Sequence, residues 1–192
     1  LTNFRYFFVG TRPEILETEK NNTPETAEGV KLPVVVNGRI HAPLDVDHFQ
    51  FAAKAGEPLV LGLVSHGMDA MGTGRDNQGY VDANLQLLDA AGRILAEAED
   101  TLGLDPLIHF TAPNDGQYIA AVKLGSYKGY PEAVYRLSLG SEPYPTAVFP
   151  AGGQQGTTVE VELSGPNVPG GTRQAIEVAA ESPLPYQFVQ TT

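Results

Sequence analysis

Short apolar runs separated by turn residues are the feature that most constrains the fold of this chain. The chain contains 21 glycines and 15 prolines among its 192 residues, and both residue types interrupt helices. Between them, Val, Leu, Ile, Tyr and Phe recur with the spacing of strands. We expect eight strands, at residues 32–40, 47–52, 58–64, 83–88, 93–97, 107–111, 117–123 and 134–139. Eight short strands within about 110 residues predict an all-β fold, an antiparallel β-sandwich.

One stretch of the chain has a composition that also suits an α-helix. Residues 82–100 are rich in Ala, Leu and Glu, which are good helix formers. Gly92, however, follows Asp89 and two alanines, and a glycine there can adopt the positive φ that closes a hairpin. The alternation on either side of Gly92 favours the hairpin over the helix.

The charge and the cysteine count exclude several classes of protein. The chain has 12 Lys and Arg against 23 Asp and Glu, a formal charge of −11, and no cysteine. Disulfide scaffolds, cysteine-based zinc sites and thiol catalysis are therefore excluded. The acidic balance disfavours nucleic acid and anionic lipid as partners. No apolar run approaches the ~20 residues of a membrane helix, so no membrane insertion is expected.

The flanks of the sandwich predict further units. Residues 1–10 contain the apolar run 4–9, which predicts a strand with no partner nearby in the sequence. We expect this strand to pair with residues 141–192 of the same chain or of a neighbouring one, because an unpaired apolar strand edge seeks a partner. Residues 11–30 form an acidic linker, residues 31–140 the sandwich, and residues 141–192 a second β unit that includes the alternating strand 157–163. About 50 residues are too few for an immunoglobulin-like sandwich, which takes ~100, so this unit is expected to be partial. The chain starts at Leu1, and we expect it to be a processed product or a piece of a longer protein.

Oxygen-bearing residues gather in two segments. The linker supplies Glu17, Glu19, Asn21 and Asn22, and the start of a predicted strand supplies Asp45 and Asp47. Calcium takes six to eight hard oxygen ligands, so the two segments together can complete one calcium site, which neither can form alone. The alternative is a solvated acidic linker and a simple turn at Asp45, and Lys20 inside the acidic run favours it slightly.

Motifs in residues 14–140 resemble the bacterial pre-peptidase C-terminal domain. The residues that carry the resemblance are Glu17, Glu19, Asn21, Asn22, Thr23 and Pro24, then Val36-Asn37-Gly38-Arg39-Ile40, Asp45-Val46-Asp47-His48-Phe49, Lys54-Ala55-Gly56, Leu85 to Gly92, Gly116, Tyr118 and Tyr135-Arg136-Leu137. The family is similar in fold to the collagen-binding domains of clostridial collagenases. The resemblance implies a secreted, jelly-roll-like sandwich that is attached to a catalytic domain in the same protein. It also implies that the sandwich binds calcium through its acidic N-terminal linker. It assigns the same six residues as metal ligands, with Asn22 in place of the usual Asp.

The C-terminal flank resembles a second family. Pro143, Pro145, Phe149-Pro150, Gly152-Gly153 and the run Gly156 to Gly165 are similar to the opening of an immunoglobulin-like domain of the TIG type. The resemblance implies a partial immunoglobulin-like unit at residues 141–192, and residues 1–10 resemble the closing strand of such a domain.

These patterns predict a non-catalytic module of a large secreted or cell-surface bacterial protein. We expect a calcium-stabilised unit for adhesion or substrate targeting, located outside the cell, at its surface or in the periplasm. Its partners would be neighbouring domains and a protein or polysaccharide ligand, bound through the loop tyrosines Tyr127 and Tyr130. The alternatives are a metal-free structural spacer and, in a different class, a hydrolase that uses Glu97 and Asp100 for acid–base work.

Overall fold

A computed structural model of the chain describes residues 7–68 and 81–181. The chain divides into two compact units, Leu1–Ser141 and Glu142–Thr192. Among the described residues, no helix has both the length and the apolar character needed to cross a membrane.

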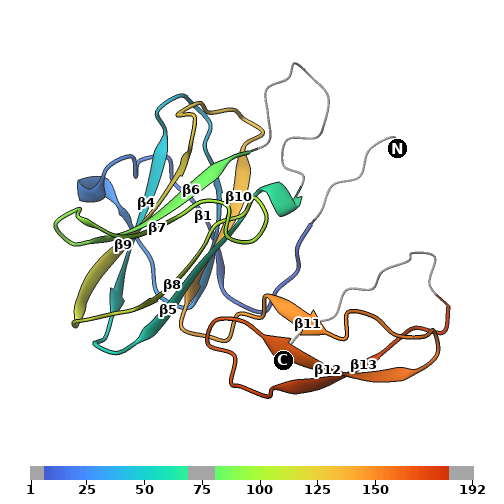
Figure 1. The fold of residues 1–192 in the computed structure, drawn as a ribbon. Coiled ribbons are helices and arrows are strands. Elements are labelled where there is room, and N and C mark those ends of the chain that lie inside the picture. The colour runs from blue at the N-terminus through green and yellow to red at the C-terminus, as the bar shows by residue number, and fades with distance from the viewer. Residues whose placement is uncertain (1–6, 69–80, 182–192) are drawn as a thin grey trace. The chain divides into compact units, whose positions relative to one another are not determined.

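The first unit is almost entirely β-structure (Figure 1). Its strands are β1 (Glu14–Leu16), β2 (Glu28–Gly29), β3 (Val34–Arg39), β4 (Val46–Ala53), β5 (Pro58–Val64), β6 (Ala83–Asp89), β7 (Ile94–Ala98), β8 (Leu107–Thr111), β9 (Gly116–Leu124) and β10 (Val134–Gly140). Two 3-10 turns, η1 (Pro24–Thr26) and η2 (His66–Met68), complete it. All eight predicted strands are present as β3 to β10, and their ends lie within two residues of the expected positions.

The strand order is that of a jelly roll. One sheet has the order β1-β3-β10-β5-β8 and the other β2-β4-β9-β6-β7. Apart from β1 and β2, each sheet holds four antiparallel strands, and the chain changes sheet at every step except between β6 and β7. Eight strands in two such sheets are the hallmark of the jelly roll. The all-β sandwich predicted from the sequence is confirmed.

The short strands β1 and β2 add parallel pairings that the prediction did not contain. β1 pairs with β3, and β2 pairs with β4, both in parallel. β3 and β4 are otherwise the edge strands at the same end of the two sheets, so the linker covers both edges. The segment between β1 and β2 therefore crosses from one sheet to the other at the open side of the sandwich.

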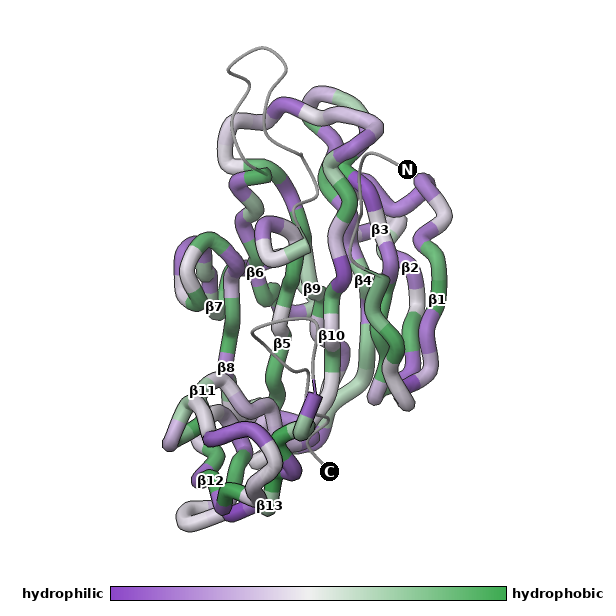
Figure 2. Tube along the Cα trace, turned by 90° about the vertical axis from the view of Figure 1, so that its right-hand side faces the viewer, coloured by the Kyte–Doolittle hydropathy of each residue, from purple (hydrophilic) through white to green (hydrophobic). Residues whose placement is uncertain are grey.

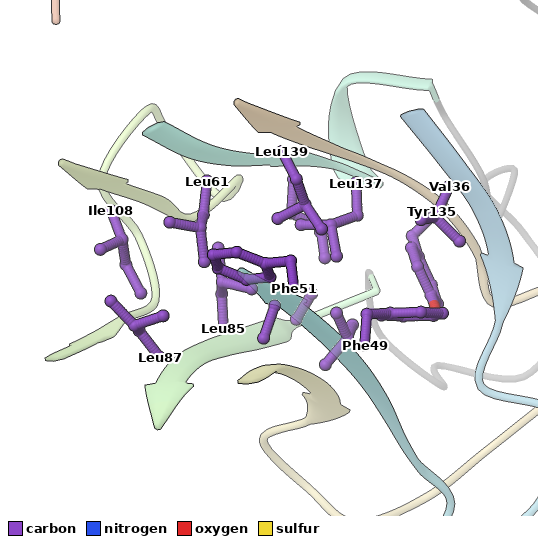
Figure 3. Close-up of a cluster of buried hydrophobic side chains, with 14 of the residues drawn as sticks. Val36, Phe49, Phe51, Leu61, Leu85, Leu87, Ile108, Tyr135, Leu137 and Leu139 are labelled. Atoms are coloured by element: carbon purple, nitrogen blue, oxygen red, sulfur yellow. The ribbon is translucent and has the colours of Figure 1, made fainter. Parts of the chain in front are cut away.

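The core between the sheets is filled by side chains from alternate positions of the strands. Buried positions recur at every second residue of β10, where Tyr135, Leu137 and Leu139 are buried. Opposite them, Phe49 and Phe51 of β4 point into the same cluster (Figure 3). The interior strand β5 is mostly hydrophobic along its length, as Figure 2 shows, and five consecutive residues of it are buried.

The stretch that competed for helix is a hairpin, as expected. β6 and β7 pair in antiparallel fashion, and Gly92 in the turn has φ of 77°. The amide of Gly92 donates to the carbonyl of Asp89, and the Asp89 carboxylate accepts from the amides of Ala91 and Arg93. The turn chemistry thus outweighs the helix propensity of the flanking Ala, Leu and Glu residues.

The second unit is a three-stranded antiparallel sheet in the order β11-β12-β13. Its strands are β11 (Ala147–Phe149), β12 (Thr158–Ser164) and β13 (Arg173–Glu177). On β12 the alternation buries Val161 and Leu163. The expected strand at residues 157–163 is therefore present with its ends shifted by one residue.

Two segments with predicted structure lie partly outside the described residues. The expected strand at 4–9 includes residues 4–6, which are outside, and residues 7–10 have no assigned strand. Of the long loop at 65–82, the structure describes residues 65–68, 81 and 82.

Candidate metal centre

The linker crosses the open side of the sandwich next to the start of β4. Glu17 follows β1 directly, and its amide donates to the carbonyl of Asn37 in β3 at 3.2 Å. Further along, the carbonyl of Asn21 accepts from the amide of His48 in β4 at 3.0 Å. These backbone bonds hold residues 17–22 against both sheets, close to Asp45 and Asp47.

Glu17, Asp47 and Tyr135 form what we call the inner cluster. The Tyr135 hydroxyl lies 2.6 Å from Asp47 Oδ2 and 3.0 Å from Glu17 Oε2. A phenol has a single proton to donate, so it can satisfy one carboxylate at a time. Asp47 and Tyr135 are buried, and Glu17 is half-buried and also accepts from the amide of Arg39.

Burial and crowding raise the pKa values of both carboxylates in the inner cluster. Burial is the largest cause for Asp47, whose pKa rises to about 9, and the neighbouring carboxylates of Glu17 and Asp45 raise it further. Burial likewise raises the pKa of Glu17, to which the charge of Glu19 adds. In the absence of a cation, the inner cluster therefore holds a proton at neutral pH.

Gly38 makes room for the inner cluster. It lies opposite Tyr135 in the pairing of β3 with β10. A Cβ atom at this position would lie 2.2 Å from the Tyr135 ring and 2.7 Å from Glu17 Oε2. Only glycine allows the tyrosine hydroxyl to pass β3 and reach the carboxylates.

Asn21 is the most deeply buried of the linker candidates. Its side chain is wholly inaccessible, and neither Oδ1 nor Nδ2 has a hydrogen-bond partner. His48 fixes its backbone, because Nδ1 of the buried imidazole lies 2.9 Å from the Asn21 carbonyl. Since a carbonyl only accepts, His48 carries its proton on Nδ1. Burial lowers the pKa of His48, which favours this neutral form.

Glu19, His41 and Asp45 form a second group, which we call the outer cluster. His41 Nδ1 lies 2.5 Å from Glu19 Oε2 and 3.0 Å from Asp45 Oδ2. Asp45 Oδ2 also accepts from the amide of His41 at 3.0 Å. Glu19 comes from the linker, and the other two residues come from the loop between β3 and β4, so the outer cluster also joins the linker to the sandwich.

The unpartnered polar atoms of the described residues gather in this region. Five buried side-chain nitrogen or oxygen atoms have no hydrogen-bond partner, and four of them belong to Asn21, Asp45 and Asp47. Buried polar atoms are ordinarily paired, and a cation is a partner that satisfies several oxygens at once. The residues present thus fit a hard cation. Asn22 and Lys20 are exposed, so the lysine side chain does not occupy the centre.

A cavity of about 440 Å³ lies beside the inner cluster. Its walls include Glu17, Glu19 and Tyr135, together with Phe8 and Arg136. The Arg136 guanidinium lies over the Phe8 ring, 5.1 Å from its centroid, and is ion-paired with Glu14 of β1. The cavity gives solvent and ions a route to the carboxylates of Glu17 and Glu19.

The two loop tyrosines differ in exposure. The Tyr127 side chain is 52% exposed, and Lys123 Nζ lies 5.4 Å from the centroid of its ring. Tyr130 is half-buried and packs against the core. Tyr127 is therefore the one of the two that presents its ring to solvent.

Sequence reasoning missed Tyr135 and His41 as parts of this centre. Tyr135 belongs to an alternating apolar run, where an aromatic residue is usually core, and its hydroxyl meets Asp47 only through strand pairing. His41 lies outside any short metal-binding spacing, but its position four residues before Asp45 is a local signal that it can reach that carboxylate.

Two known proteins are similar to this chain. No protein-family model matches this chain. A stretch of 80 residues, 42% of the chain, is 39% identical to part of a probable subtilase-type serine protease of Deinococcus radiodurans and spans 10% of that protease. The chain is also similar to the pre-peptidase C-terminal domain of a collagenase from Bacillus anthracis, with 15% identity, a TM-score of 0.42 and coverage of 68% of this chain and 99% of that domain. That domain is named for the family that the motifs in residues 14–140 resemble.

Proposed function

We propose that this chain is a non-catalytic module of an exported bacterial protein, in which calcium joins the linker to the sandwich. The observation that carries the proposal is the set of unpartnered buried side-chain oxygens of Asn21, Asp45 and Asp47. The likeness of 80 residues to part of a probable subtilase-type serine protease supports a module that is attached to a protease. The exported setting is what the resemblance to the pre-peptidase C-terminal domain implies.

Glu17, Asn21 and Asp47 are the residues we assign to the calcium ion first, with Glu19, Asn22 and Asp45 as the remaining predicted ligands. Bound calcium would supply a fixed divalent charge that satisfies their oxygens without a proton. Glu17 and Asp47 would then both be ionised, and the Tyr135 hydroxyl would keep its bond to one of them. The linker residues would thereby be fixed to β4, which sets the direction in which the chain enters the sandwich.

The hydrolase alternative has less support from the geometry. A general acid needs a raised pKa, whereas hydrogen bonds from Gln86 and Asn84 lower the pKa of Glu97. Glu97 and Asp100 are both exposed.

A thermal melt of metal-stripped protein tests the proposal. Millimolar calcium is expected to raise the melting temperature of the wild type, and magnesium at the same concentration to raise it less, because magnesium requires a tighter octahedral site. The Asp47→Asn variant is expected to lose the calcium response. An equal response of wild type and variant, or no response of the wild type, would contradict the calcium proposal and leave the metal-free spacer.

The loop that carries Tyr127 supports a second candidate function, the binding of an extracellular protein or polysaccharide. The amide of Leu44 donates to the carbonyl of Tyr127 at 3.0 Å, so the tyrosine loop is tied to the loop that ends at Asp45. A Cβ atom on Gly129 would lie 1.9 Å from the Ala42 carbonyl oxygen, so the two backbones are in direct contact. Leu44 and Tyr127 both have positive φ and exposed side chains, a strained geometry found at binding sites.

Binding of insoluble collagen, cellulose and chitin by wild type and Tyr127→Ala tests this second candidate. The variant is expected to lose retention on the substrate that the wild type binds, while Tyr144→Ala in the second unit serves as the matched control. Equal retention of wild type and Tyr127→Ala on every substrate would contradict a role for this loop.

A further inference from the structure

One buried, unpartnered side-chain atom of the described residues lies outside the metal centre, and it is Oδ1 of Asn84 in β6. Asn84 is only 2% exposed. Its amide nitrogen is already engaged, because Nδ2 donates to Glu97 Oε1 and to Glu99 Oε1, each at 2.9 Å. The amide group is therefore held between two carboxylates, while its oxygen still needs a donor.

These side chains lie on the face of the sheet that points away from the core. Asn84 and Gln86 alternate along β6 with residues of the core cluster, so they point to the opposite side. Across the strands, Asn84 is paired with Lys123 of β9, and Gln86 with Glu97 of β7. The three strands are neighbours in one sheet (Figure 1), so the polar side chains form a continuous surface.

The two carboxylates are fixed acceptors. Gln86 Nε2 donates to Glu97 Oε1 at 2.7 Å, in addition to the bond from Asn84. These hydrogen bonds lower the pKa of Glu97, so its carboxylate is ionised at neutral pH. Glu97 and Glu99 are both exposed. A ligand that binds to them from solvent must therefore supply hydrogen-bond donors.

Lys123 connects the carboxylates to an aromatic ring. Its Nζ lies 5.4 Å from the centroid of the Tyr127 ring, and its charge also acts on Glu97. The Tyr127 side chain is 52% exposed. An ammonium group beside the carboxylates disfavours a metal ion there, because like charges repel. The surface instead offers acceptors, a donor and a ring to one extended ligand.

We propose that Glu97, Glu99, Lys123 and Tyr127 form a binding face for an uncharged polysaccharide, with Asn84 holding the two carboxylates in place. Sugar hydroxyls both donate and accept, so one chain can donate to the carboxylates and accept from the lysine. The apolar face of a sugar ring suits the exposed ring of Tyr127. The ligand would displace the flexible lysine side chain to reach Asn84 Oδ1.

This inference rests on the second candidate function and deepens it. It commits to a polysaccharide rather than a protein as the ligand. It also adds the hydrogen-bonding groups of β6, β7 and β9 to the tyrosine loop.

Depletion of the protein from solution by microcrystalline cellulose and by chitin tests the polysaccharide face. The wild type is expected to bind at least one of the two, and Glu97→Ala and Tyr127→Ala each to weaken that binding about tenfold. Glu97→Gln keeps the shape of the side chain without its charge and is expected to weaken binding as well. Glu160→Ala is the matched control, since it removes an exposed, hydrogen-bonded glutamate of β12, and it is expected to bind like the wild type.

Further outcomes separate this inference from the proposals above. Equal binding of Glu97→Ala and wild type, with weaker binding of Tyr127→Ala, would overturn the polysaccharide face and leave the tyrosine loop as a binding site. Retention of the wild type on insoluble collagen alone would overturn the polysaccharide and indicate a protein ligand. Absence of binding to all three materials would contradict this inference together with the second candidate function. The calcium-induced shift in melting temperature is expected to be the same in Glu97→Ala and the wild type, because the polysaccharide face contains none of the proposed calcium ligands.

Discussion

Substitution of Asp47 by asparagine should remove the loss of stability that this carboxyl causes in the metal-free protein as the pH rises. In the folded chain the pKa of Asp47 is raised to about 9, chiefly by burial, whereas an exposed aspartate has a pKa near 3.9. A carboxyl whose folded pKa is raised stabilises the fold at low pH and loses that contribution as pH rises between these two values. Asparagine resembles the protonated carboxyl and does not titrate.

The expected difference in the free energy of unfolding between the two proteins follows from the pH interval. Each unit between the unfolded and folded pKa costs about 1.4 kcal/mol per group, so raising the pH from about 5.5 to 7.5 should cost the wild type about 3 kcal/mol relative to Asp47→Asn. For a unit of this size, that corresponds to a difference in melting temperature on the order of 8 °C. The comparison with the variant removes most of the contribution of His48, whose lowered pKa acts in the opposite direction.

Melts of both proteins in chelator at the two pH values provide the assay, with Asp100→Asn as an exposed control. The wild type should lose stability relative to Asp47→Asn as pH rises, and saturating calcium should remove most of that loss. Parallel behaviour of wild type and Asp47→Asn in chelator would refute the reasoning about the inner cluster.

The remaining predictions concern neighbouring residues. Gly38→Ala should destabilise the unit by about 1–3 kcal/mol and reduce the calcium-induced shift in melting temperature, because the new methyl group would overlap the Tyr135 ring. Gly29→Ala is the control: its methyl group meets no atom within 4 Å, so the melting temperature and the calcium-induced shift should both stay unchanged. Asp105→Ala should cost on the order of 3 kcal/mol in urea unfolding and leave the calcium shift intact, because its carboxylate accepts from three successive amides near η2. His48→Ala should speed hydrogen exchange of the linker, because the ring that holds the linker carbonyl is lost; unchanged exchange would contradict this anchor.

The sequence predicts the strands well because each one carries its own alternation and its own turns. β5 and β8 begin and end at the expected residues, since turn residues bound them on both sides. The strands β1 and β2 were missed because they are only three and two residues long and pair through the backbone of β3 and β4. Nothing in their side chains indicates that pairing.

The candidate metal centre likewise contains residues that local sequence patterns indicate and residues that only the pairing of distant strands brings in. The candidate oxygen ligands can be proposed from the sequence because Glu17, Glu19 and Asn21 lie close together and carry the hard oxygen atoms that calcium takes. The contributions of Tyr135 and Gly38 depend on the register of β10 against β3, which local patterns do not specify. The division into an inner and an outer cluster likewise depends on where His41 meets Glu19 in space.

Hydrogen exchange of the linker, measured with and without calcium, tests the central claim most directly. If calcium joins the linker to the sandwich, amides of residues 17–22 in wild-type protein should exchange more slowly in millimolar calcium than in chelator, and the Asp47→Asn variant should show no such difference. Equal exchange of these amides in calcium and in chelator would contradict the claim.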